Sequence, residues 1–134
     1  MAISKTVIKL THIEAVVKIV NDVAGAATTT IDLDVDLLKS NEELTGETPL
    51  VNLGTIDVGL ANNAEATITR NNVLISNMFE NTLGYLMEFG ADPTQNTSDV
   101  VVSFTGKGTM FVRLFKIKGY RPLFRPEQGV NTWD

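Results

Sequence analysis

Cysteine is absent from the sequence and histidine occurs once, as His12, and these shortages exclude several classes of function. A chain without cysteine has no disulfide framework, no thiolate zinc site and no cysteine nucleophile. One histidine excludes a His-rich metal site and leaves little for ordinary acid–base catalysis. The formal net charge of −5 argues against a domain that binds nucleic acid over its whole surface. We therefore expect a protein that is not an enzyme, with no catalytic residues, metal or cofactor.

Long apolar segments are also lacking. The start of the chain, Met1–Thr6, has no apolar core of a secretory signal. Apolar stretches such as Val100–Val102 are far shorter than the ~20 residues needed to cross a bilayer. The total of 134 residues, 43% of them hydrophobic, is the length and composition of one globular domain. These features predict synthesis in the cytoplasm and no membrane association.

Residues that favour β-strands are abundant. Valine, isoleucine and threonine, which are β-branched and fit a pleated surface, account for 39 of the 134 residues. Apolar and polar residues alternate with a period of two, as in 13–19 and 31–37, which no helix would use. Turn-forming Asn and Gly recur at short intervals. We expect strands near residues 3–10, 13–20, 28–38, 50–59, 64–70, 73–79, 83–89, 98–105 and 109–118, although 77–89 could instead contain one short helix. The pattern predicts an all-β fold, an antiparallel β-sandwich or jelly roll in a single domain.

Basic residues concentrate at the C-terminal end of the chain. Residues 107–134 contain six of the eleven Lys and Arg but two of the sixteen Asp and Glu. Pro122 and Pro126 lack backbone donors and cannot occupy a central strand. We therefore expect a β-sandwich domain, 1–118, followed by an extended C-terminal arm, 119–134, rather than another strand. The candidate interface residues are the cations and aromatics of this region: Lys116, Lys118, Tyr120, Arg121, Phe124, Arg125 and Trp133.

Three roles for the arm remain open from its composition. It could dock on a neighbouring subunit, where aromatic residues and arginine dominate interface energetics. It could also wrap over its own domain, or bind single-stranded nucleic acid. The acidic remainder of the chain and the small number of clustered cations argue against nucleic acid.

Two short motifs resemble known binding loops but do not match them. Asp32, Asp34 and Asp36, with Glu43, place acids at positions 1, 3, 5 and 12 of an EF-hand loop, yet Leu37 replaces the glycine at position 6. We expect these aspartates to form the solvent face of a strand, with a weak calcium site left open. Residues 106–109 lack the flanking glycine and the Ser or Thr after Lys107 that a phosphate loop requires, so we expect a hairpin turn. We expect His12 to be a solvent-facing or hydrogen-bonded structural residue rather than a metal ligand or a catalytic base.

Four stretches resemble small virion proteins from tailed phages of marine bacteria, especially cyanobacterial phages. They are Met1–Lys9, Ala66–Asn71, Asn96–Val102 and Arg113–Tyr120, and together they span nearly the whole chain up to Tyr120. None of them encodes a chemical mechanism. The ending after Tyr120 is longer than in the shorter members of that group.

The resemblance implies a non-enzymatic structural protein of a virion, and we expect a capsid decoration or cement protein that stabilises the phage head. A neck, tail or baseplate component is one alternative. A carbohydrate-binding surface module is another, and it would need exposed aromatics on one sheet face. The expected partners are other copies of the chain and the major capsid protein or another virion protein, without nucleic acid or membrane. The expected location is the virion, after synthesis in the host cytoplasm.

Overall fold

The computed structural model describes residues 3–79, 82–85 and 97–123, and it contains strands and turns but no helix in these ranges. The strands are β1 (Ile3–Leu10), β2 (Glu14–Asn21), β3 (Ala27–Ile31), β4 (Glu42–Leu44), β5 (Leu50–Leu60), β6 (Ala66–Arg70), β7 (Val73–Met78), β8 (Thr82–Tyr85), β9 (Val100–Phe104), β10 (Gly108–Lys118) and β11 (Tyr120–Pro122). No described segment is a helix long and apolar enough to span a membrane.

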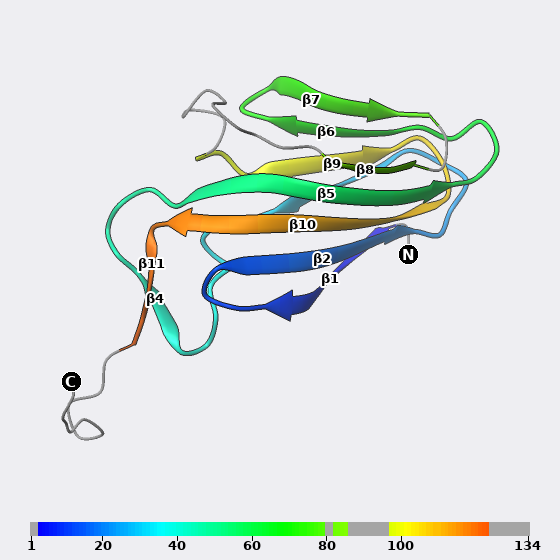
Figure 1. The fold of residues 1–134 in the computed structure, drawn as a ribbon. Helices are drawn as coiled ribbons and strands as arrows, with labels where there is room; N and C mark the ends of the chain where they lie inside the picture. The colour runs from blue at the N-terminus through cyan, green and yellow to red at the C-terminus, as the bar shows by residue number, and fades with distance from the viewer. Residues whose placement is uncertain (1–2, 80–81, 86–96, 124–134) are drawn as a thin grey trace.

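The strands form two facing sheets and one small outlying pair (Figure 1). One sheet has the order β1-β2-β10-β5-β8, and the other has the order β3-β9-β6-β7. Strands β11 and β4 pair with each other and extend from one end of the sandwich (Figure 1). Every pairing is antiparallel. The predicted all-β antiparallel sandwich in a single domain is therefore confirmed.

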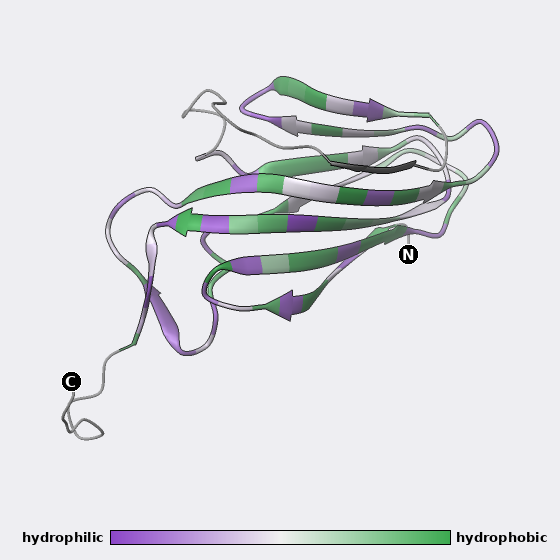
Figure 2. Ribbon diagram, viewed as in Figure 1, coloured by the Kyte–Doolittle hydropathy of each residue, from purple (hydrophilic) through white to green (hydrophobic). Residues whose placement is uncertain are grey.

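The core lies between the two sheets, and the period-two alternation of the sequence places its residues there. Apolar and polar residues interchange along the central strands in Figure 2, as expected for strands with one buried face. The fully buried apolar side chains include Val17 and Ile19 on β2, Val112 and Leu114 on β10, and Phe104 on β9. Burial of each such side chain contributes about 1.5–3 kcal/mol relative to exposure, so this interface dominates the stability of the fold.

The prediction of one strand over 28–38 is wrong after Ile31, where the chain enters a turn. The Asp36 backbone N–H donates to the Asp32 carbonyl at 2.8 Å, and the Asp32 backbone N–H donates to Asp36 Oδ2 at 2.7 Å. Leu33 and Leu37 are buried, whereas Val35 is 68% exposed. The aspartates are therefore not the solvent face of a strand. Two leucines four residues apart fit the inner side of a helical turn as well as they fit a strand.

Asp36 also takes part in a contact between the two sheets at one side of the sandwich. Its Oδ2 lies 2.6 Å from Lys5 Nζ, and the same ammonium donates to the Thr30 carbonyl at 2.7 Å. This cation therefore links β1 of one sheet to β3 of the other. Within the described ranges, no group of three or more acidic or histidine side chains is arranged to hold a metal ion.

Other connections differ in smaller ways from the sequence-based expectations. The turn at 106–108 joins β9 to β10, which belong to different sheets, so it is not the predicted hairpin. Strand β4 was not predicted, and Tyr120–Pro122 form strand β11, where an arm without strand structure was expected. Pro122 is tolerated because β11 has only three residues and one partner strand. The predicted strand at 83–89 corresponds to β8 over Thr82–Tyr85, and residues 86–89 lie outside the described ranges.

Candidate docking site at the β4–β11 end

The β4–β11 pair is where the described part of the candidate arm meets its own domain. Tyr120, Arg121 and Pro122 pair with Leu44, Glu43 and Glu42, respectively. Arg121 Nε lies 2.7 Å from Glu43 Oε2, in an exposed ion pair. The Leu123 backbone N–H donates to the Asn41 carbonyl at 2.7 Å. Leu123 is thus held against the segment that enters β4.

Gly119 makes the corner between β10 and β11. Its φ of +102° lies in the region that side chains disfavour, and a Cβ at this position would lie 2.5 Å from Pro49 Cα. The Gly119 carbonyl accepts a hydrogen bond of 3.0 Å from the Thr45 backbone N–H. The direction in which the chain leaves β10 is therefore set by a close backbone contact.

A buried ion pair lies beneath this corner. Lys116 Nζ is 2.6 Å from Glu42 Oε1, and the two side chains are 0% and 2% exposed. The ammonium also donates to the Thr11 carbonyl at 3.0 Å and lies 4.3 Å from the centre of the Tyr120 ring. Burial lowers the pKa of Lys116, and the Glu42 carboxylate opposes that shift. Glu42 Oε2 has no hydrogen-bond partner, so the pair is tightly packed but incompletely satisfied.

Tyr120 ties the same region to the turn that follows β3. Its hydroxyl donates to the Leu33 carbonyl at 2.7 Å. Burial raises the pKa of Tyr120, and the carboxylates of Asp34 and Glu42 act in the same direction. Both effects favour the protonated hydroxyl, which is the form that donates to the Leu33 carbonyl.

Arg70 organises the neighbouring loops from inside the sandwich. It ends β6, is fully buried, and donates through Nε and Nη2 to the Ser98 carbonyl at 3.1 and 2.8 Å. Its Nη1 donates to the Val51 carbonyl at 2.7 Å. One guanidinium thus fixes the chain before β9 against the first residues of β5.

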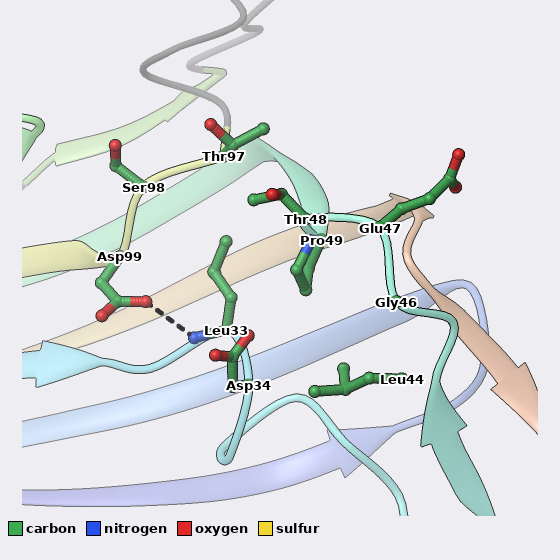
Figure 3. Close-up of a pocket in the computed structure, with 10 residues that line it drawn as sticks. All are labelled: Leu33, Asp34, Leu44, Gly46, Glu47, Thr48, Pro49, Thr97, Ser98 and Asp99. Atoms are coloured by element: carbon green, nitrogen blue, oxygen red, sulfur yellow. Dashed lines mark hydrogen bonds between the residues drawn. The ribbon is translucent and has the colours of Figure 1, made fainter.

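An open pocket of about 540 Å³ lies among these loops (Figure 3). Three acidic side chains line it, Asp34, Glu47 and Asp99, and its apolar lining includes Leu33 and Leu44. Figure 3 shows Asp99 beside the Leu33 backbone, whose N–H donates to Asp99 Oδ1 at 3.0 Å. The remaining lining residues are Gly46, Thr48, Pro49, Thr97 and Ser98. Three carboxylates in a pocket that also has apolar lining residues suit an arginine flanked by apolar or aromatic side chains.

The structure divides the candidate interface residues into three groups. Lys116 and Tyr120 are directed into their own domain, so the Lys116 ammonium is not a docking cation in this conformation. Lys118 and Arg121 are exposed. Phe124, Arg125 and Trp133 lie outside the described residues.

Sequence reasoning missed Glu42, Arg70 and the pocket. A signal for Arg70 existed, because Ala66, Ile68 and Arg70 alternate on one face of β6 and all three are buried. No local pattern connects the pocket segments, which are distant in sequence.

A second, smaller hollow lies on the outer face of the five-stranded sheet. It measures about 210 Å³ and is lined by Val16, Thr55, Asp57, Phe111 and Arg113. Lys18 Nζ lies 5.9 Å from the centre of the Phe111 ring. An aromatic ring beside a carboxylate and a guanidinium is an arrangement that can stack on and hydrogen-bond to a small polar ring.

No protein-family model matches the sequence, and no curated protein is significantly similar to it.

Proposed function

We propose that the protein is a non-enzymatic structural component of a virion, a decoration or cement protein that stabilises a phage head. Its partners would be other copies of the chain and the major capsid protein or another virion protein. The sequence resemblance to small phage virion proteins supports this proposal, as does the compact β-sandwich that carries it. A position in the neck, tail or baseplate remains the alternative within the same particle.

The observation that carries the docking part of the proposal is the acidic pocket beside the start of β11, where Tyr120 pairs with the pocket residue Leu44. Residues 124–134 begin one residue after the Leu123 anchor and include Phe124, Arg125 and Trp133. An extended chain of this length reaches roughly 35 Å at ~3.3 Å per residue, enough to reach an adjacent subunit. Arg125 is the one cation of this segment, which also contains Glu127 and Asp134, and this residue is the one that complements the carboxylates of the pocket on that subunit.

Truncation after Leu123 tests this role. Because β11 and its contacts are kept, the shortened chain should fold with an unchanged circular dichroism spectrum and midpoint of urea unfolding. It should fail to bind particles that lack the protein, in a co-sedimentation assay. Phe124→Ala should weaken attachment by about 2–4 kcal/mol if this ring is a buried anchor.

A pair of point variants provides the control. Glu47→Lys reverses one charge of the pocket and should weaken attachment, whereas Lys107→Ala, on the exposed turn between β9 and β10, should not. Normal attachment of a folded, truncated chain would contradict a docking role for residues 124–134. Unfolding of the truncated chain would show that these residues belong to the core.

Carbohydrate binding is the second candidate, favoured by the hollow beside Phe111. A sugar ring could stack on Phe111 while its hydroxyls bond to Asp57 and Arg113. On a glycan array the full chain should then retain one class of surface glycan, and Phe111→Ala should weaken binding at least about tenfold, or 1.4 kcal/mol. Ile117→Ala, an exposed residue on the same strand, should leave binding unchanged. An array without any bound glycan would exclude this candidate.

A further inference from the structure

Strand β7 is an open sheet edge. It is the outermost strand of the four-stranded sheet, pairs with β6 on one side and lies at the top of the sandwich in Figure 1. No strand in the described part of the chain pairs with its other side. A free edge presents backbone N–H and C=O groups that another strand can bind.

The side chains of this edge are uncharged and largely apolar. The run from Val73 to Phe79 contains no Asp, Glu, Lys or Arg. Val73, Leu74 and Phe79 are 40%, 56% and 60% exposed, respectively. Ile75, at a bulge in the pairing with β6, packs instead against the core. Exposed apolar residues on a free edge are the combination that soluble proteins ordinarily avoid.

The edges on the other side of the sandwich are protected. Strand β1 carries Lys5 and Lys9 and has a bulge between Val7 and Lys9. Strand β3 lies against β1 and is covered through the hydrogen bond from Lys5 Nζ to the Thr30 carbonyl. Lysines and bulges are standard protection against unwanted strand pairing. Residues 73–79 have the bulge at Ile75 but no lysine or other charged residue, and Val73, Leu74 and Phe79 are exposed, which marks this edge as a surface for association.

We propose that β7 of one copy pairs antiparallel with β7 of a second copy across a two-fold axis, joining the two four-stranded sheets into one. A two-fold interface brings the same surface of each chain together, so it must be complementary to itself. Each copy has a net charge of −5, so two copies repel each other over most of their surfaces. The edge at 73–79 has no charged residue, and two such edges can meet without bringing like charges together. The new pair would satisfy the free backbone groups and cover Leu74 and Phe79. This pairing is independent of the proposed virion role.

The mass of the full chain in solution tests the pairing. Light scattering during gel filtration should give about twice the 14.6 kDa of the chain. Val73→Lys combined with Leu74→Lys should raise the dissociation constant at least about tenfold, because the pairing would then bury lysines against the uncharged, apolar edge of the second copy. Ile8→Lys, on the protected β1 edge and 51% exposed in the natural chain, should leave the dimer intact. Truncation after Leu123 should also leave it intact, which separates this surface from the arm.

A cross-linking experiment keeps the test decisive if the double-lysine variant fails to fold. Since the chain has no cysteine, Ser76→Cys or Asn77→Cys on β7 should form a disulfide-linked dimer on oxidation, whereas Thr28→Cys on β3 should not. A monomeric natural chain at about 100 μM, far above the dissociation constant of a stable dimer, would overturn the proposal. A folded double-lysine variant that stays dimeric would also overturn it. Binding of a different virion protein to the β7 edge of a monomeric chain would also overturn the proposal.

Discussion

Lys116→Met should lower the free energy of unfolding by about 3–5 kcal/mol, the cost of removing one partner from a buried ion pair. The substitution leaves the Glu42 carboxylate buried without its cation, and Glu42 Oε2 already lacks a partner. It also removes the contact with the Tyr120 ring that helps to hold β11. Urea unfolding, followed by far-ultraviolet circular dichroism, measures the loss.

Two control variants separate the ion pair from simple packing. Lys118→Met removes an exposed lysine two residues away and should change stability by no more than about 0.5 kcal/mol. The double variant Lys116→Met, Glu42→Leu replaces both charges by apolar groups and should recover most of the loss. A double variant as unstable as Lys116→Met would mean that the orphaned carboxylate is not the cause.

Arg70→Met should lower the free energy of unfolding by about 3 kcal/mol or more, and it should also alter the pocket. The guanidinium donates to the Ser98 carbonyl and to the buried Val51 carbonyl, and a buried acceptor that loses its donor costs about 1–3 kcal/mol. Removal of the fully buried Arg70 side chain adds a loss of packing. Because Ser98 lies between two other pocket residues, Thr97 and Asp99, faster amide hydrogen exchange should appear there as well as at β5.

The matched control for this variant is Arg113→Met on the outer face of β10. Arg113 is exposed and lies 3.7 Å from Glu14 in a surface ion pair, so its replacement should change stability by less than about 1 kcal/mol. Equal destabilisation by the two substitutions would show that Arg70 does not have the organising role assigned to it. A destabilised Arg70→Met variant with normal exchange near Ser98 would limit that role to the core.

The alternation of apolar and polar residues predicted most of the strands of the sandwich. A strand with one buried and one exposed face must alternate in this way, because successive side chains point to opposite faces. A spacing of two along β10 places Lys116 on the same face as Val112 and Leu114, which is the inner face of the sheet. That position alone implies a buried anion, but nothing local singles out Glu42 among sixteen acidic residues. The pairing depends on β4, a strand of three residues that is too short to give a periodic signal.

The segment after Ile31 shows where alternation misleads. A spacing of four between Leu33 and Leu37 is consistent with a strand and with a helical turn, and only the contacts of Asp32 and Asp36 decide between them. The pocket depends on this turn, on the 45–49 loop and on the chain before β9. Its geometry arises from tertiary packing, which a single sequence does not encode as a local motif.

The central place of β10 has a consequence for biosynthesis. Strand β10 lies between β2 and β5, yet it is translated long after either of them. While residues 108–118 are still within the ribosome, β2 can pair with β1 alone, and its apolar inner residues lack the strand that will cover their flank. Closing such long-range pairings is slow, since the loop entropy must be overcome before the contacts form. The five-stranded sheet is therefore completed only after β10 has left the ribosome, and until then the facing edges of β2 and β5 are open to pairing with other chains.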